Sequence, residues 1–208
     1  MRPDKALAKA AELTPAERQV YTGSWTTEAG LVTVSGQGNT LRAEAFGKTF
    51  QLLPRADGRL RLQYKLLGVI PIPLGGLADV GLFHAEMDGR HLVIARQGEE
   101  ERVFGERFSP EPIPAPWVQR VGDYEIVNLG GDFPSVTGAR LAIEKGVLMS
   151  ELSGSLPMPS TVLKPINDRK AIVLGTLSDM GETVTVVVRD GEELLVSSEY
   201  LFKKKPGQ

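Results

Sequence analysis

Ser109–Trp117 reads Ser-Pro-Glu-Pro-Ile-Pro-Ala-Pro-Trp, with prolines at four alternate positions. Each proline fixes φ near −65° and removes a backbone N–H donor, so the segment cannot lie in the interior of a sheet. We expect it to run as a stiff, extended spacer of the polyproline type, about 3 Å long per residue. Because the sequences on its two sides resemble each other, we predict two β domains joined by this linker. Such a short spacer would leave Ile113 and Trp117 packed between the two domains.

The sequence before the linker has the cadence of an antiparallel β domain. Alternating segments predict strands at residues 31–35, 41–46, 49–53, 59–65, 81–87, 90–97 and 102–108. Asp88-Gly89 separates two of them and is the strongest short hairpin signal. Strands that recur about every ten residues are typical of an up-and-down barrel of about eight strands or of a small sandwich.

The sequence after the linker repeats this plan. It predicts strands at residues 124–128, 139–144, 147–152, 161–164, 170–174, 183–189 and 193–202, with Asp190-Gly191 as the matching hairpin turn. Four short segments align in the same order in both halves. Gly23-Ser24-Trp25 aligns with Gly122-Asp123-Tyr124, and Pro54–Asp57 with Pro165–Asp168. A duplication explains these matches, and a coincidence of β-protein sequence texture is the alternative.

A helical lead-in precedes the first β domain. Pro3–Leu13 is rich in alanine and predicts a helix, and Thr14–Glu17 has the pattern of a capping box that starts a second helix ending near Val20. No helix is expected beyond it. We therefore predict an all-β fold of two tandem antiparallel eight-stranded barrels: a lead-in over residues 1–20, barrels over 21–108 and 118–205, and the linker over 109–117.

One uncharged segment, Leu66–Ala78, departs from the strand cadence. Its two prolines and three glycines are expected to break any regular strand. It is either a buried strand and loop, or an exposed apolar loop that docks on a partner, a lipid or the mouth of a substrate cleft. The candidate docking residues are Leu66, Leu67, Val69, Ile70, Ile72, Leu74 and Leu77.

The composition argues against several kinds of site. The chain has no cysteine, and its net charge of −2 lacks the positive footprint of a nucleic-acid-binding protein. His84 and His91 flank the Asp88-Gly89 turn and could be cross-strand neighbours. Zinc requires three or four ligands, and Glu86 and Asp88 are the carboxylates nearby, so we predict ordinary strand histidines. We predict no catalytic residue, no metal and no cofactor.

Two segments resemble a known family: Leu13–Trp25, which leads into the first β domain, and Phe104–Phe108, which ends it. They are similar to the C-terminal region of serine hydrolases related to penicillin-binding proteins and class C β-lactamases. The resemblance implies that a bacterial catalytic domain would be followed by one or two eight-stranded, lipocalin-like barrels. It covers nearly the whole chain, although its motifs are short.

The chain departs from that family's catalytic pattern. No serine has a lysine three residues later, and the nearest approach, Thr161-Val162-Leu163-Lys164, lies in a predicted strand. The resemblance therefore implies a non-catalytic accessory region that shapes substrate access or mediates oligomerisation, with a β-lactamase-like catalytic domain as its partner in cis or in trans. The alternative is a free-standing lipocalin-like module that holds a small apolar ligand in one barrel.

The sequence is compatible with more than one cellular compartment. We find no signal peptide and no apolar run long enough for a transmembrane helix. The chain is either cytoplasmic or a piece of an exported hydrolase, which would place it in the periplasm or outside the cell.

Overall fold

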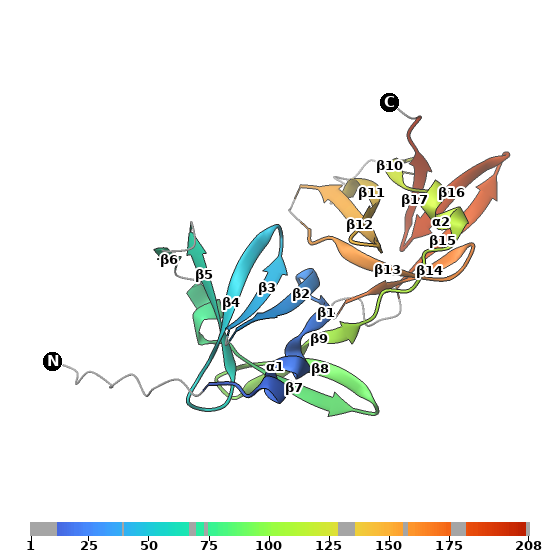
Figure 1. Cartoon of the computed structure of the whole chain (residues 1–208). Coiled ribbons are helices and arrows are strands. Elements are labelled where there is room, and N and C mark those ends of the chain that lie inside the picture. The colour runs from blue at the N-terminus through green and yellow to red at the C-terminus, as the bar shows by residue number, and fades with distance from the viewer. Residues whose placement is uncertain are drawn as a thin grey trace. The chain divides into compact units, whose positions relative to one another are not determined.

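The computed structural model describes residues 12–38, 40–66, 70–72, 75–128, 136–155, 158–175 and 182–206. The chain divides into two compact units, Met1–Trp25 with Val32–Phe108, and Thr26–Leu31 with Ser109–Gln208. Each contains a closed, eight-stranded antiparallel barrel (Figure 1). The prediction of an all-β fold with two tandem barrels is confirmed.

The first barrel follows a short helix. Its elements are α1 (Pro15–Tyr21), β1 (Gly23–Thr27), β2 (Gly30–Gln37), β3 (Thr40–Ala45), β4 (Lys48–Pro54), β5 (Leu60–Leu66), β6 (Ile70–Ile72), the 3₁₀ helix η1 (Gly75–Asp79), β7 (Gly81–Met87), β8 (Arg90–Gln97) and β9 (Glu100–Phe108). The strand order is β4-β3-β2-β1-β9-β8-β7-β5, and pairing of β4 with β5 closes the ring while β6 extends β5.

The second barrel also follows a short helix. Its elements are α2 (Ala115–Gln119), β10 (Gly122–Ile126), β11 (Val136–Glu144), β12 (Val147–Gly154), β13 (Thr161–Asn167), β14 (Lys170–Leu174), β15 (Thr183–Arg189), β16 (Glu192–Ser197) and β17 (Tyr200–Lys204). The strands pair in chain order, and β10 pairs with β17 to close the ring.

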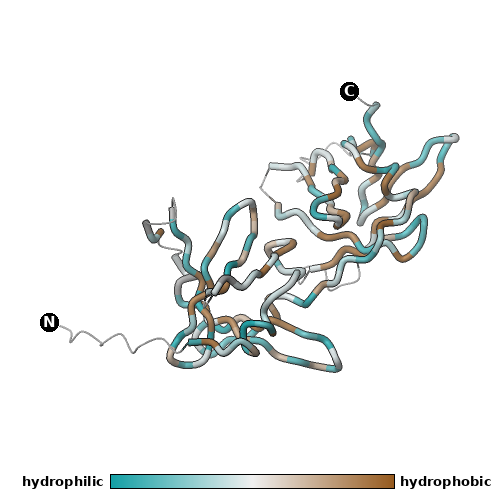
Figure 2. The backbone as a smooth tube through the Cα atoms, viewed as in Figure 1, coloured by the Kyte–Doolittle hydropathy of each residue, from teal (hydrophilic) through white to brown (hydrophobic). Residues whose placement is uncertain are grey.

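Side-chain alternation along the strands builds the two cores. In β3, Leu41 and Ala43 are buried while Arg42 and Glu44 are exposed, as a strand with one face toward a core requires. Figure 2 shows the same alternation as brown and teal along the tube. Trp25 belongs to the hydrophobic core of the first barrel and Trp117 to that of the second.

The two predicted Asp-Gly hairpins are confirmed. Asp88 and Gly89 have φ values of 52° and 75°, and Asp190 and Gly191 have 51° and 81°. Positive φ at both central residues is the signature of the type I′ turn, whose twist matches that of the flanking strands. Asp88-Gly89 joins β7 to β8, and Asp190-Gly191 joins β15 to β16.

The predicted strand over residues 193–202 is wrong, because the structure has two strands there. β16 ends at Ser197 and pairs with β17 through Ser197 and Tyr200. Ser198 takes a φ of 50° in the turn between them. The Ser198-Glu199 turn lacks the glycine, proline or asparagine that would reveal it, so the two strands read as one.

The linker is not extended to its end. α2 begins at Ala115, with the Trp117 and Val118 amides donating to the carbonyl of Pro114 at 2.9 and 3.2 Å. Pro116 is tolerated because the amides of a first helical turn have no intrahelical acceptor. The expectation of no helix beyond the lead-in is therefore wrong. Trp117 is fully buried in the core of the second unit, and Ile113 packs against that core.

The lead-in is confirmed where it is described. Thr14 caps α1: its amide donates to Glu17 Oε2 at 2.7 Å, and the Glu17 amide donates to Thr14 Oγ1 at 3.2 Å. The predicted helix over Pro3–Leu13 lies almost entirely outside the described residues. No helix among the residues that the structure describes has both the length and the apolar character needed to cross a membrane.

The uncharged segment Leu66–Ala78 contains regular structure where it is described. Ile70–Ile72 forms β6, which is antiparallel to β5 with Ile72 opposite Tyr64 and Ile70 opposite Leu66. The 3₁₀ helix η1 follows β6 in the chain. The expectation that prolines and glycines exclude any strand here is wrong. Pro71 is compatible with β6 because β6 is the last strand in the sheet order, and proline is tolerated in edge strands.

Candidate functional site

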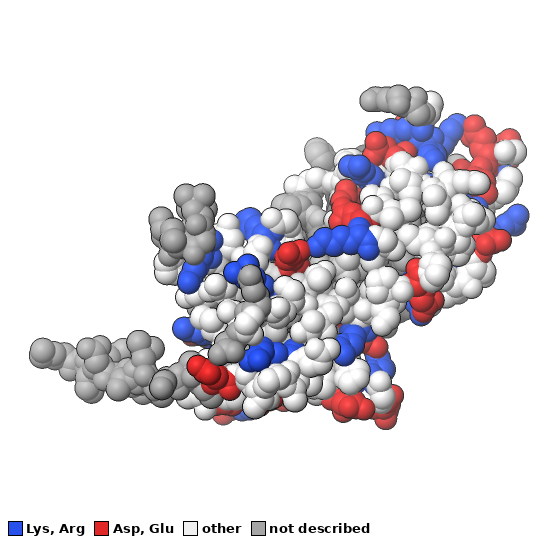
Figure 3. Space-filling view, viewed as in Figure 1, with Lys and Arg blue, Asp and Glu red and all other residues white. Residues whose placement is uncertain are grey.

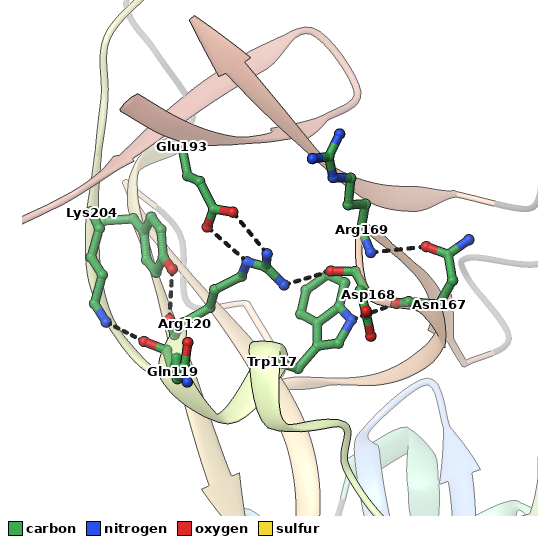
Figure 4. A network of polar contacts seen from close by, with 9 residues as sticks. Trp117, Gln119, Arg120, Asn167, Asp168, Arg169, Glu193 and Lys204 are labelled. Atoms are coloured by element: carbon green, nitrogen blue, oxygen red, sulfur yellow. Dashed lines mark hydrogen bonds and ion pairs between the residues drawn. The ribbon is translucent and has the colours of Figure 1, made fainter. Parts of the chain in front are cut away.

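A pocket of about 550 Å³ lies at the end of the second barrel beside α2. Elements distant in sequence supply its walls: α2, the start of β10, the β13–β14 turn, the start of β16 and the end of β17 (Figure 4). The lining residues are Pro116, Gln119, Arg120, Tyr124, Asp168, Arg169, Glu193, Leu195 and Lys204. Charged side chains therefore surround a partly apolar floor, which makes this end of the barrel the candidate site of the second unit.

Arg120 is the centre of the polar network in this pocket. Its side chain is 10% exposed, and its Nε and Nη2 donate to Glu193 Oε2 and Oε1 at 3.1 and 3.0 Å. Nη1 donates to the carbonyl of Asp168 at 2.6 Å. Nε, Nη1 and Nη2 of Arg120 therefore each donate to an acceptor. Through these bonds the guanidinium connects the end of α2 to the β13–β14 turn and to β16.

Trp117 and Arg120 form one structural unit. The guanidinium lies 5.2 Å from the centre of the indole ring, within the range of a cation–π contact. The indole Nε1 donates to the carbonyl of Asn167 at 2.8 Å, so a fully buried ring has its polar atom satisfied. Together they attach α2 to the barrel end.

Two ionisable groups in the pocket have shifted pKa values. Hydrogen bonds from Arg120 hold the pKa of Glu193 below its ordinary value, which keeps the carboxylate ionised. Burial raises the pKa of Tyr124 to about 12, so its hydroxyl stays protonated at neutral pH and donates to the carbonyl of Arg120 at 2.6 Å. Both groups are therefore held in the states that the network needs.

The first unit has an equivalent arrangement. Trp25 is 2% exposed and donates from Nε1 to the carbonyl of Tyr21 at 2.8 Å, and the Arg107 guanidinium lies 5.2 Å from its ring. Arg107 Nη2 donates to the carbonyls of Val20 and Thr22 at 2.7 and 2.8 Å, at the C-terminal end of α1. In both units a cation on the last strand therefore bonds the final carbonyls of the short helix. In the second unit that cation is Lys204, whose Nζ donates to the carbonyl of Gln119 at 2.8 Å.

The histidines predicted as cross-strand neighbours are in contact. His84 Nε2 and His91 Nδ1 are 3.0 Å apart, and the backbone of His84 donates to the Tyr21 hydroxyl at 3.2 Å. The pKa of His84 is lowered by burial and by the charges of His91 and Arg107, while Glu86 acts against the shift. Among the residues that the structure describes, no group of three or more His, Asp or Glu side chains is placed to hold a metal ion.

The candidate docking residues are only partly described. Leu67, Val69 and Leu74 lie outside the described residues, and the backbones of Leu66, Ile70 and Leu77 are in β5, β6 and η1. The side chain of Ile72 is described and is 36% exposed. The seven residues therefore remain a prediction.

Charges of both signs share the surface. Figure 3 shows Lys and Arg mixed with Asp and Glu over the described part of the visible face of each unit. Ion pairs such as Lys203 Nζ with Glu192 Oε2, at 2.7 Å, contribute to this mixing.

Sequence reasoning did not identify Arg107, Arg120, Glu193 or Lys204. Arg120 and Glu193 are 73 residues apart, and no local pattern joins them. The alignment of Gly23-Ser24-Trp25 with Gly122-Asp123-Tyr124 could have indicated part of the site, because it also aligns Tyr21 with Arg120. The carbonyls of these two residues accept the hydrogen bonds from Trp25 and Tyr124.

No protein-family model matches the chain, and a comparison with functionally characterised proteins finds no match either.

Proposed function

We propose that this chain is a non-catalytic module of two lipocalin-like barrels, accessory to a β-lactamase-like serine hydrolase in cis or in trans, where it shapes substrate access or mediates oligomerisation. The observation that carries the proposal is the repeated closure of a barrel end by a short helix. Arg107 and Lys204 bond the last helix carbonyls, and Trp25 and Tyr124 bond a carbonyl four residues earlier in the chain. These polar groups are used to hold each helix against its barrel.

The packing of the second barrel supports an accessory role over that of a ligand carrier. Trp117, Leu148 and Leu163 are each at most 2% exposed and belong to one core cluster. An eight-stranded barrel is just wide enough for its own side chains to fill, or to hold one small ligand in their place. A carrier would have to exchange this packing for the ligand, whereas an accessory module uses its outer surface.

The test is a kinetic measurement on the 208-residue chain and on a β-lactamase-like hydrolase encoded in the same genome. Hydrolysis of a small nitrophenyl ester and of a bulky chromogenic β-lactam is followed with the chain alone, with the hydrolase alone and with both, fused or mixed. We expect the chain alone to give the background rate. We expect its presence to change the ratio of the hydrolase's kcat/KM values for the two substrates, because a module that shapes access acts by substrate size. Heat-denatured chain is the control.

Two outcomes would overturn the proposal. The first is hydrolysis by the purified chain that persists through purification to homogeneity. The second is a stoichiometric apolar molecule extracted from the native chain with organic solvent and identified by mass spectrometry, which would establish the alternative of a ligand-binding module.

A further inference from the structure

The contact between His84 and His91 lies on the core-facing side of β7 and β8. Leu82 of β7 and Ala95 of β8 are opposite each other and both buried. Because side chains alternate along a strand, every second residue of β7 counted from Leu82, and of β8 counted from Ala95, points to the same inner face. His84 follows Leu82 by two residues and is opposite Val93, which packs against the core. His91 precedes Val93 by two residues and is opposite Glu86. The two imidazoles are therefore diagonal neighbours, with the carboxylate of Glu86 on the same face.

The separation of the two ring nitrogens agrees with joint coordination of one metal ion. Metal-bound imidazole nitrogens lie about 2.0–2.1 Å from zinc, so two of them at a right angle are about 2.9 Å apart and at a tetrahedral angle about 3.3 Å apart. The observed distance from His84 Nε2 to His91 Nδ1 is 3.0 Å. Two imidazole nitrogens completed by water oxygens make up the N,O ligand set of the tetragonal sites that Cu²⁺ and Ni²⁺ prefer.

We propose that His84 and His91 form a binding site for one tetragonal divalent transition-metal ion, Cu²⁺ or Ni²⁺, with the remaining positions filled by water. The ion replaces the hydrogen bond between the two nitrogens. The imidazole that donates this bond changes tautomer and carries its proton on its other ring nitrogen, and each ring turns about its Cβ–Cγ bond so that both lone pairs meet at the metal. Two protein ligands leave the remaining coordination positions to water at these partly exposed side chains, which distinguishes this site from the closed four-ligand structural sites of zinc. The bound ion joins β7 to β8 near α1.

Side chains from three neighbouring elements, α1, β7 and β9, surround the two imidazoles. Tyr21 from α1 contacts His84 through its hydroxyl and its ring, which lies edge-on at 6.4 Å between centroids. Arg107 from β9 adds positive charge and Glu86 from β7 adds negative charge. The positive charge of Arg107 disfavours a bound cation, and the negative charge of Glu86 offsets this repulsion.

The composition of the chain makes the site easy to test. His84 and His91 are its two histidines, and it has no cysteine, so untagged protein offers no competing imidazole or thiolate. Cu²⁺ is titrated into the untagged chain at pH 7.5, with binding followed by calorimetry and the ligands identified by electron paramagnetic resonance. We expect one tightly bound ion per chain, a tetragonal spectrum and couplings from two imidazole rings. Ni²⁺ is expected to compete for the same site.

Three variants complete the experiment. His84→Gln and His91→Gln are each expected to weaken Cu²⁺ binding by roughly tenfold or more, because a chelate loses one of its two linked ligands. Glu99→Gln, in the turn between β8 and β9, is the control and is expected to bind like the unchanged chain. Circular dichroism verifies that each variant is folded. The electron paramagnetic resonance spectrum of Cu²⁺ bound to the unchanged chain tests the proposal even if a variant fails to fold. Binding without imidazole couplings, binding unchanged in both histidine variants, or no 1:1 binding would each overturn the proposal.

Discussion

Tyr124 donates a hydrogen bond from its hydroxyl to the backbone carbonyl of Arg120, four residues earlier in the chain, at 2.6 Å. In the other unit, Trp25 donates from its indole to the carbonyl of Tyr21, also four residues earlier, at 2.8 Å. Gly23 and Gly122 precede these aromatic residues by two positions and have φ values of 131° and 144°. The same turn from helix to first strand, held by the same kind of bond, therefore occurs in both units.

Removing the Tyr124 hydroxyl tests the strength of this bond. Tyr124→Phe leaves the carbonyl of Arg120 without its buried donor and is expected to lower the free energy of unfolding by about 1–3 kcal/mol. Tyr200→Phe in the same barrel is the matched control, because Tyr200 packs its ring against Phe202 and is only partly buried. Urea unfolding followed by ¹⁹F signals of labelled Trp117 reports on the second unit. Equal effects of the two substitutions would contradict the role of the hydroxyl.

Arg120 is expected to matter more than its partner carboxylate. Arg120→Met removes the bonds to Glu193 and to the Asp168 carbonyl, and should cost about 2–3 kcal/mol because bonds from a charged donor are the stronger kind. Glu193 is 53% exposed, so Glu193→Gln should cost under about 1 kcal/mol. Urea unfolding of both variants and of the double variant gives the coupling between them. A larger loss in Glu193→Gln than in Arg120→Met would contradict this hierarchy.

The Arg120–Glu193 pair predicts a dependence of stability on pH. The folded-state pKa of Glu193 lies below its ordinary value of 4.5, so the contribution of the ionised carboxylate is fully present above that value. It is lost as the pH falls through the folded-state pKa. The stability difference between the unchanged chain and Glu193→Gln should therefore shrink in acid. Unfolding free energies from pH 7 down to pH 3 check this, and a difference that grows toward acid would contradict the direction of the shift.

Gly89 tests the hairpin turn that the sequence predicted. Its φ is 75°, and a Cβ placed there would meet no atom within 4 Å, so Gly89→Ala changes the backbone preference alone. We expect a loss of about 1–2 kcal/mol, the usual cost of a left-handed conformation for a residue with a Cβ. Gly36→Ala in β2 is the control, since a Cβ there would be 3.9 Å from Thr22 Oγ1 and Gly36 does not need a positive φ. The ¹⁹F signal of Trp25 follows both, and equal losses would contradict the argument.

Local sequence signals predicted most of the fold. Asp88-Gly89 and Asp190-Gly191 set their hairpins through backbone conformation alone, and the capping box at Thr14–Glu17 fixed the start of α1. α2 was missed because a proline in the first turn of a helix and a proline in an extended linker share the same φ. A sequence gives no means of separating the two without knowing where Trp117 packs.

The candidate site was less predictable because long-range contacts build it. Arg120 meets Glu193 and the Asp168 carbonyl only after β13, β14 and β16 have closed the barrel. The contact of His84 with His91 was predictable, since seven residues and one tight turn separate them. Charged residues used for closure and charged residues left on the surface look alike in a sequence.

The most direct test of the central claim asks whether this chain accompanies a serine hydrolase in its source cells. A cell lysate is treated with a fluorescent penicillin and a fluorophosphonate probe, and an antibody to the chain captures its native polypeptide. The proposed function predicts a labelled serine hydrolase in the captured material, as a longer polypeptide that contains these residues or as a protein bound to them. Labelling of the 208-residue chain itself, or capture without any labelled hydrolase, would contradict it.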